Sequence, residues 1–565
     1  MTDVDEGMAN RRKRAERAGL VVICVAAATV YLTLIHAPFL SWDDDRNISA
    51  NPYLLNSDWW PLWLKPYFGL YVPVTTTVWA ALFHATNGNA EAFRVFNAAL
   101  HVVNTILVWQ LLRRFLERMS INGRSPRTGI AVLLGVAVFA VHPLQTATVG
   151  WISGGRDVLA TTFALGSTLL YFRRANRSYV MATLLFGAGL LSKPSIAAVP
   201  IAIVCYVALF EKPALRRTFA DMAVWCALVA VIALRTSASQ SDMMRVVVPL
   251  YQRPLVAVDA AGFYVLKTLW PVSLNLDYGR TPAWILANRS AAVPTTVALV
   301  VVAIVLWLLA RRRRAYAVSL AWLILLTPVL GITTFAFQHI STVSDHYTYL
   351  PLVAVAMVVA LAANDAVTRR GVLWALLIAM LVSGSVASVR RLRAWRSDQA
   401  LFSDVVSKNP HSFIALTNLA KDACAKGSYR VGLDFALKSL QASPAETAGL
   451  VNKAYCLFQL REYDELIEMQ GALLDPDVQF NLERNDDGAS ALANLIAGGL
   501  FQRGQPERGW AFLCQARALN PRDRDLQANA AEIADLFRQK RRQTPTCPRR
   551  LPWATFADLV VKPGV

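Results

Sequence analysis

Three consecutive carboxylates, Asp43, Asp44 and Asp45, directly follow the first long apolar segment of this 565-residue chain. Charged side chains are too costly to place in hydrocarbon, so these three must lie in water at the membrane surface. A carboxylate in that place can take or orient the proton of an acceptor hydroxyl while a leaving group departs. Asp43 and Asp44 are therefore candidate catalytic residues. The alternative is a solvated, charge-rich helix cap.

If the leaving group in such a reaction is a phosphate, it needs cations close to those carboxylates. We expect three cations and two histidines on the same face of the membrane: Arg156, Lys193 and Lys267, with His142 and His346. For each one alone, the alternative is snorkelling to the interface, and Arg156 could simply pair with Asp157. Five such residues on one face favour a shared anionic ligand, because each would be costly beside lipid without a partner. The three carboxylates could also bind a divalent cation, although no further ligand for it is evident.

A polar stripe occupies another predicted helix. Arg94, Asn97, His101 and Asn104 recur at positions i, i+3, i+7 and i+10, so they share one helix face. In a membrane helix we expect such a stripe to bond neighbouring helices rather than a substrate. The sequence has no Walker loop and no GxSxG, HExxH or dinucleotide motif, so nothing indicates ATP hydrolysis or a nicotinamide cofactor.

The elements that must position these residues are membrane helices. The chain is 55% hydrophobic, with a mean hydropathy of +0.38, which is too apolar for a soluble protein. Its net charge of +19 comes largely from Lys and Arg between apolar runs. This distribution is the positive-inside pattern and does not indicate a nucleic-acid partner.

The charge pattern also predicts the topology. The chain has basic clusters at 11–17, 113–127, 173–177, 212–217, 311–314 and 369–370. All of them lie on the cytoplasmic side if the chain crosses the membrane an odd number of times between its N-terminus and residue 390. Eleven spans satisfy this: 20–40, 93–112, 129–147, 154–172, 178–193, 196–210, 218–235, 291–310, 315–335, 347–363 and 371–389. Outer segments 41–92 and 236–290 then contain surface-lying or re-entrant helices at 72–83 and 254–271. We expect a basic cytoplasmic N-terminus at 1–19 and a membrane domain at 20–396.

The chain changes character after about residue 397, where span-length apolar runs stop. A 34-residue pattern of small residues, aromatic residues and prolines fits three helical repeats of the tetratricopeptide type at 397–537. Such repeats stack into a solenoid whose concave surface binds a peptide or a protein partner. We expect residues 538–565 to form a loosely ordered basic, proline-rich tail. The seven cysteines lack CxxC or zinc spacing, so they are interpreted as small apolar fillers without disulfides.

Several short motifs occur together in an order that is characteristic of one family. They are Trp42-Asp43-Asp44 with Ile48 and Asn51-Pro52, His142-Pro143 with Trp151, Leu191-Ser192-Lys193-Pro194, Tyr264 with Lys267 and Trp270-Pro271, Asp345 to Pro351, and Trp395. Over essentially the whole chain this series resembles the membrane protein O-mannosyltransferases with C-terminal tetratricopeptide repeats, in a bacterial relative. The resemblance implies an all-α, polytopic GT-C fold of about eleven spans followed by a small repeat solenoid.

The resemblance also implies an activity. Such enzymes move a sugar, typically mannose, from a polyprenyl phosphate to Ser or Thr of proteins outside the cytoplasm. Asp43 and Asp44 match the acidic catalytic pair, and Asp45 is an extra residue. Ala147 stands where the family usually has glutamate, Gly155 where it usually has arginine, and His346 replaces the more common arginine of the Asp345 motif. A histidine that bound phosphate would make that binding pH-dependent.

The expectation is an integral-membrane glycosyltransferase of the bacterial inner membrane. Its partners would be membrane lipid, a lipid-linked sugar and, at the periplasmic repeats, a protein acceptor or assembly partner. Two alternatives remain open at this point. The same fold could act on a surface glycan or lipid, or the chain could be a membrane-anchored repeat scaffold without enzymatic activity. A transporter is disfavoured, because the sequence shows no second inverted half.

Overall fold

The computed structural model describes residues 3–119, 128–240, 248–288, 293–309, 313–365, 369–539, 546–547 and 550–560. Parts of two predicted basic clusters, 120–127 and 311–312, and parts of the tail predicted at 538–565, namely 540–545, 548–549 and 561–565, lie outside the described residues. The chain divides into two units, Met1–Leu401 and Phe402–Val565. Across the described ranges every regular element is a helix, and the one strand-like pairing is an isolated bridge between Tyr67 and Leu70. The all-α prediction is confirmed.

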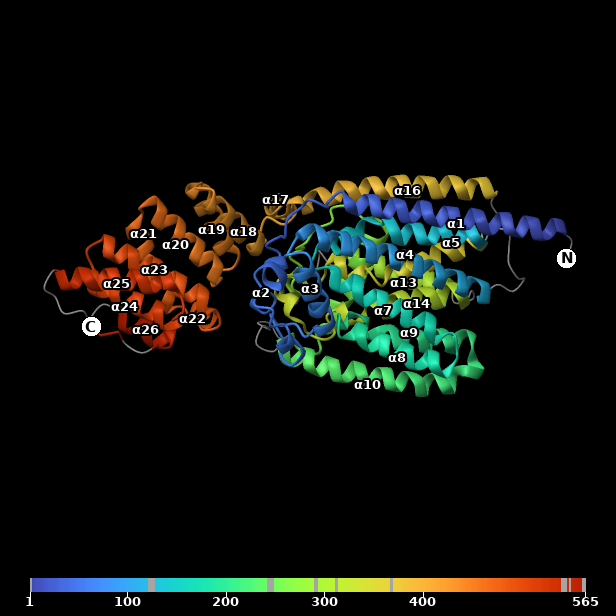
Figure 1. The fold of residues 1–565 in the computed structure, drawn as a ribbon, viewed down its shortest axis with the longest axis horizontal. Coiled ribbons are helices and arrows are strands. Elements are labelled where there is room, and N and C mark those ends of the chain that lie inside the picture. The colour runs from blue at the N-terminus through green and yellow to red at the C-terminus, as the bar shows by residue number, and fades with distance from the viewer. Residues whose placement is uncertain are drawn as a thin grey trace. The chain divides into compact units, whose positions relative to one another are not determined.

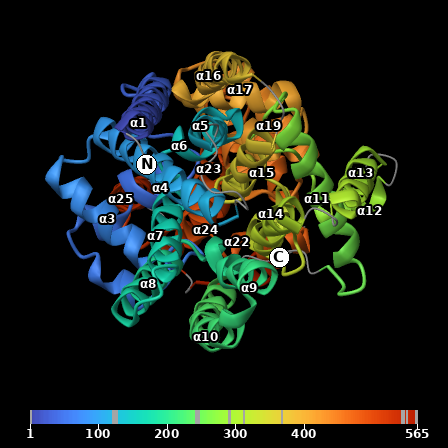
Figure 2. The ribbon, with the colours of Figure 1, turned by 90° about the vertical axis from the view of Figure 1, so that its right-hand side faces the viewer.

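A helix lies at each of the eleven predicted spans. Figure 1 shows the long helices α1, α10 and α16 running along a common direction, and Figure 2 looks down the bundle. The helices are α1 (Asp3–Leu32), α4 (Ala90–Met119), α5 (Thr128–Val141), α7 (Gly155–Tyr171), α8 (Asn176–Leu190), α9 (Val199–Phe210), α10 (Leu215–Gln240), α13 (Val293–Leu309), α14 (Arg313–Leu326), α15 (Leu352–Asp365) and α16 (Arg370–Leu392).

Five helical segments in the described ranges are long and apolar enough to cross a membrane: Lys13–Leu32, Ala90–Arg118, Thr128–Val149, Lys212–Ser239 and Arg370–Arg396. The other helices at predicted spans are shorter than expected, and prolines explain two of the interruptions. Pro194 opens the short helix η4 (Pro194–Ala198) that separates α8 from α9, and α15 begins directly after Pro351. Proline lacks the backbone N–H that a helix interior requires, so a helix ends or restarts there. Lys193 and His346 lie beside these interruptions.

The two predicted outer segments carry short helices. The first contains η1 (Asp45–Ser49), α2 (Pro52–Leu55), η2 (Trp60–Trp63) and α3 (Pro73–Ala85), packed over a small apolar core that includes Ile48 and Trp79. The second contains α11 (Arg253–Leu269) and α12 (Pro282–Ala287). Helix α11 packs so closely on α13 at Gly262 that a Cβ atom there would lie only 2.0 Å from the Thr295 carbonyl oxygen.

The loops between these helices, and the segment after α16, contain further short helical turns. They are η3 (Pro143–Gln145), α6 (Thr146–Val149), η5 (Lys212–Ala214), η8 (Thr327–Val329), η9 (Ala336–His339), η10 (Asp345–Thr348) and η11 (Arg393–Arg396). Helix α17 (Asp398–Lys408) follows η11, and the boundary between the two units falls inside it.

The second unit consists of packed helices at the places where the repeats are predicted. Gly427 and Gly504, with φ of +78° and +73°, form two of the tight turns between paired helices. A positive φ favours glycine there. The helices are α18 (Phe413–Ala425), α19 (Tyr429–Ala442), α20 (Thr447–Leu460), α21 (Tyr463–Glu468), η12 (Met469–Leu474), α22 (Pro476–Leu482), α23 (Asp486–Gln502), α24 (Pro506–Leu519), α25 (Arg524–Gln539) and α26 (Trp553–Val560). That the repeats are of the tetratricopeptide type stays a prediction.

Two sequence-based expectations about this unit are wrong. Four cysteines that were expected to be apolar fillers form disulfides, Cys424–Cys456 and Cys514–Cys547. The paired cysteines are 32 and 33 residues apart, on different helices or, for Cys547, beyond the last repeat. Spacing rules for local motifs do not detect such pairs. The described part of the tail, 550–560, is also more ordered than expected. Helix α26 buries Trp553 and Phe556, and the Phe556 ring lies 5.0 Å from that of Phe512.

Candidate active site

The loop that follows α1 holds the three carboxylates in different environments. Asp44 is fully buried, and its two oxygens accept hydrogen bonds from the backbone N–H groups of Leu40 at 3.1 Å and Ser153 at 2.8 Å. Asp44 therefore fastens the loop to the segment before α7, and its carboxylate is occupied by backbone donors. Its neighbour Asp45 accepts a bond from the N–H of Arg46 at the surface.

Asp43 is the carboxylate that remains available for chemistry. Its backbone is left-handed, with φ of +66°, which is uncommon for a residue with a Cβ atom. Among the described residues no hydrogen bond or ion pair engages its carboxylate, and the residue is partly exposed. Burial raises the pKa of Asp43, while the positive charges of Arg156 and Arg46 lower it. The structure thus distinguishes the two carboxylates by their contacts: backbone donors engage Asp44, and none engages Asp43 among the described residues.

The buried position of Asp44 predicts a pH-dependent stability difference. Burial raises the pKa of Asp44 to about 6, although the hydrogen bonds from Ser153 and Leu40 oppose this. Because the pKa of Asp44 is higher in the folded than in the unfolded chain, protonation of Asp44 favours the folded state. This contribution to the free energy of unfolding is lost as the pH rises through about 6. The Asp44→Asn variant keeps a neutral group at every pH. Its melting temperature in detergent should therefore rise relative to wild type between about pH 4 and pH 7. A difference that stays constant with pH would contradict this.

Arg156 and Lys193 form a positively charged cluster near Asp43. Arg156 is buried at the start of α7, where its Nε donates to the Ser153 carbonyl at 2.9 Å and its guanidinium lies 5.4 Å from the ring of Trp151. Across the described residues no partner engages its two terminal nitrogens. Lys193 pairs with Asp157 at 2.6 Å, so the alternative pairing of Arg156 with Asp157 is not what the structure has.

His346 belongs to the same cluster. Its Nδ1 lies 2.8 Å from the hydroxyl of Ser344, and its ring packs 5.5 Å from that of Trp151. Burial lowers the pKa of His346 well below its ordinary value, and the charges of Lys193 and Arg156 lower it further. The ring is therefore neutral at pH 7. It can offer a hydrogen bond to an anion without titrating near neutrality.

The other two candidates for phosphate binding are engaged elsewhere. In His142, Nδ1 accepts from the N–H of Leu144 at 3.3 Å and Nε2 donates to the Thr268 carbonyl at 3.2 Å, so both ring nitrogens are used. The ammonium of Lys267 donates to the carbonyls of Val272 and Ser273, at 2.7 and 3.3 Å. These contacts hold Lys267 at the turn after α11, and its part in phosphate binding stays a prediction.

The polar stripe on α4 bonds neighbouring segments, as predicted. Arg94 alone donates to three carbonyls on two separate loops, at distances between 2.6 and 2.8 Å. His101 and Asn104 both contact the hydroxyl of Tyr349, at 2.7 and 3.1 Å. The stripe thus ties together the backbone around the carboxylate loop, the start of α7 and the start of α15. The acceptor carbonyls belong to Ala37, Pro38, Ala140, Gly150, Trp151, Ile152 and Val158.

The stripe also gives a physical reason for one departure from the family pattern. A Cβ atom at Gly155 would lie 2.4 Å from Oδ1 of Asn97, whose amide nitrogen donates to the carbonyls of Trp151 and Ile152 at 3.1 Å. A larger side chain at this position would displace Asn97 from the backbone it supports. Ala147 is buried in α6, and nothing in the structure explains why alanine stands there.

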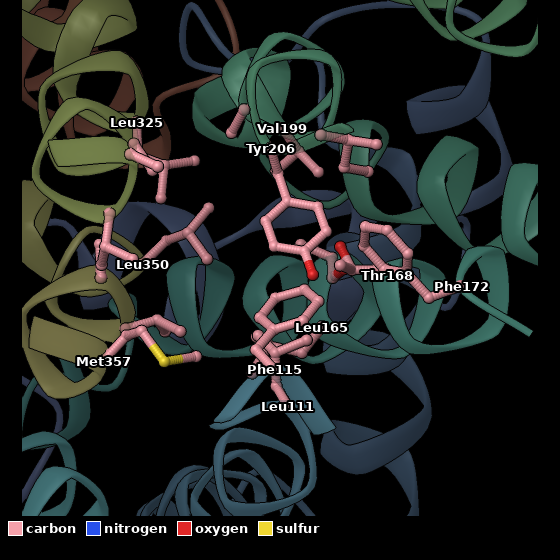
Figure 3. Close-up of a pocket in the computed structure, with 18 residues that line it drawn as sticks. Leu111, Phe115, Leu165, Thr168, Phe172, Val199, Tyr206, Leu325, Leu350 and Met357 are labelled. Atoms are coloured by element: carbon pink, nitrogen blue, oxygen red, sulfur yellow. The ribbon is translucent and has the colours of Figure 1, made fainter. Parts of the chain in front are cut away.

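An apolar pocket of about 120 Å³ lies within the helix bundle (Figure 3). Its walls come from α4, α7, α9, α14 and α15. Three of these helices, α7, α9 and α15, start close in sequence to Arg156, Lys193 and His346 respectively. The labelled lining residues are Leu111, Phe115, Leu165, Thr168, Phe172, Val199, Tyr206, Leu325, Leu350 and Met357. Sequence reasoning missed this pocket, because its residues are ordinary apolar positions on helices far apart in the chain.

The site therefore combines a carboxylate that no described residue engages with buried cations, and an apolar pocket lies elsewhere within the same helix bundle. Within the described residues no group of three or more His, Cys, Asp or Glu side chains is arranged to hold a metal ion. Such a combination suits a ligand with an anionic head and an apolar body in a membrane protein.

Comparison with known proteins finds similarity to protein mannosyltransferases. Residues 69–238 match the family model described as dolichyl-phosphate-mannose-protein mannosyltransferase. The chain is 22% identical over 437 residues to the protein O-mannosyl-transferase F38B6.6 of Caenorhabditis elegans, a match that covers 71% of this chain and 59% of that protein. It is 29% identical over 191 residues to the protein O-mannosyl-transferase Tmtc1 of Drosophila melanogaster, covering 31% of this chain and 21% of that protein. No solved structure matches.

These matches confirm the resemblance to the protein O-mannosyltransferases. The matched family model covers the segment from the first outer loop through α10, which includes Arg156 and Lys193. The chain spans less than two thirds of the length of either relative.

Proposed function

We propose that the chain is an integral-membrane glycosyltransferase that moves mannose from a polyprenyl-phosphate donor to a Ser or Thr hydroxyl of a protein outside the cytoplasm. The names of the similar proteins support the sugar and the acceptor class. The observation that carries the proposal is the position of Asp43. Among the described residues, its carboxylate is the one of the three without a hydrogen bond, and it lies near the cation Arg156.

In this reaction the acceptor hydroxyl oxygen attacks C1 of the donor sugar. A new glycosidic C–O bond forms, the bond between C1 and the phosphate oxygen breaks, and the polyprenyl phosphate leaves with the electron pair. Asp43 takes the proton of the hydroxyl. Arg156 and Lys193, with the neutral ring of His346, stabilise the negative charge of the leaving phosphate. Asp44 keeps the loop, and hence Asp43, in position.

The apolar pocket supports a lipid donor. Leu350 lines it and lies three residues after Tyr347, whose ring is 5.5 Å from the ammonium of Lys193. A lipid whose phosphate is bound by Lys193 could therefore place its first apolar carbons along α15 and into the pocket. A nucleotide sugar has no apolar segment that would use this space.

The donor class can be tested with the purified chain in detergent. Labelled mannose would be supplied either as the polyprenyl phosphate or as a nucleotide sugar, together with a mixture of extracytoplasmic proteins as acceptor. We expect protein labelling from the lipid-linked donor only. Equal labelling from the nucleotide sugar would contradict the proposed donor.

The two disulfides support an extracytoplasmic position for the second unit. Disulfides persist in oxidising compartments and are rare in the cytosol. All four disulfide cysteines belong to the unit Phe402–Val565, whereas the three free cysteines, Cys24, Cys205 and Cys226, lie in helices of the first unit. This agrees with an orientation in which the N-terminus is cytoplasmic and the repeats face the periplasm of a bacterial inner membrane.

Thiol counting in native membranes tests this orientation. After rapid denaturation with a polymer-linked maleimide, the chain should gain three labels without reduction and seven after reduction, because four thiols are held in disulfides. The products separate on a gel. Seven labels before reduction would show that the second unit lies in a reducing compartment.

A further inference from the structure

The loop that carries Asp43 is attached at a second point, and the attachment is Asp398. The Asp398 carboxylate accepts two hydrogen bonds from Ser41, one from its backbone N–H at 2.8 Å and one from its hydroxyl at 2.7 Å. Ser41 lies two residues before Asp43. A charged acceptor with two short hydrogen bonds to one residue fixes both the position and the direction of the backbone at that residue.

A neighbouring contact supports the loop from the same segment. Trp395 is fully buried and stacks on Trp151, with ring centroids 6.4 Å apart. Trp151 in turn donates from its Nε1 to the carbonyl of Trp42 at 2.9 Å. Residues 395–398 thus hold Ser41 directly and Trp42 through one intermediate, and these are the two residues that precede Asp43.

We propose that Asp398 is a positioning residue for Asp43. The left-handed backbone of Asp43 is held between two anchors, Asp44 on its C-terminal side and the bond from Ser41 to Asp398 on its N-terminal side. Releasing one anchor lets the carboxylate move, and a displacement of about 1 Å can reduce a rate by about 100-fold. Because Asp398 is the first residue of α17, the helix within which the second unit begins, the geometry at Asp43 also depends on that helix.

The test rests on the proposed function and uses the full-length chain in the transfer assay. Asp398→Ala should lower kcat at least tenfold while the donor KM stays within twofold, since the cations that hold the phosphate are untouched. Asp404→Ala is the matched control, because it removes a carboxylate from the same helix that pairs with Lys408 at 2.6 Å. Its kcat should stay within twofold of wild type.

Two further variants keep the test decisive if Asp398→Ala does not fold. Ser41→Ala removes one of the two hydrogen bonds and Asp398→Asn removes the charge, so each should give a smaller fall in kcat with an unchanged donor KM.

In an Asp43→Asn background, Asp398→Ala should have no further effect on the residual rate. A kcat for Asp398→Ala equal to that of Asp404→Ala, or additive loss in the double variant, would overturn the proposal. If Asp43→Asn itself leaves activity intact, the proposed function fails instead.

Discussion

Asp43→Asn should reduce sugar transfer by at least about 100-fold, the lower range expected when a general base is removed. The asparagine is nearly isosteric but cannot take the proton of the acceptor hydroxyl. No hydrogen bond within the described part of the chain depends on the Asp43 carboxylate, so the substitution should leave membrane insertion and thermal stability close to wild type. Initial rates in purified samples, compared at matched protein and donor concentrations, measure the effect.

Asp45→Asn is the matched control for this variant. It removes a carboxylate from the same loop whose described partner is the neighbouring backbone N–H of Arg46, and it should keep most of the activity. Equal loss in the two variants would mean that the loop needs its total charge rather than a base at position 43. Full activity of Asp43→Asn would remove Asp43 from the mechanism.

Lys193→Ala should impair both stability and donor binding, and a second substitution should separate the two effects. The variant leaves Asp157, whose side chain is only 6% exposed, as an unpaired buried charge. Breaking a buried pair in this way costs about 3–5 kcal/mol. The Lys193→Ala/Asp157→Ala double variant removes that charge as well, so its melting temperature should return towards wild type. Its donor KM should stay raised at least tenfold, because the cation that holds the phosphate is still missing.

The outcome of this pair of variants decides what Lys193 does. A donor KM that recovers together with stability would mean that Lys193 serves the fold alone. Lys267→Ala provides a comparison with a cation on the same predicted face. Its ammonium is engaged by two backbone carbonyls of the turn after α11, so its donor KM should rise less than that of Lys193→Ala.

The sequence was sufficient to predict the helical class and the place of the helices, because long apolar runs and prolines act locally. It also predicted that Arg94 and its stripe would bond neighbouring segments. It did not distinguish Asp43 from Asp44, since adjacent carboxylates have the same chemistry until a fold buries one of them. The backbone N–H of Ser153, 109 residues away, makes that distinction.

Other features depended on contacts that no local pattern records. The disulfides join cysteines 32 and 33 residues apart, and the bond between Ser41 and Asp398 joins residues 357 apart. His142 and Lys193 both looked like ligands at a membrane surface. The fold uses the histidine to cap a turn and brings the lysine beside Asp157 and Tyr347.

The most direct test of the account is to follow labelled mannose from its polyprenyl phosphate into separated protein, lipid and glycan fractions, with wild-type chain and with the Asp43→Asn variant. The account predicts label in protein that disappears in the variant. Variant-sensitive label in the lipid or glycan fraction would keep the catalytic site and contradict the acceptor. Absence of any label that depends on Asp43 would contradict the enzyme itself and favour a membrane-anchored scaffold.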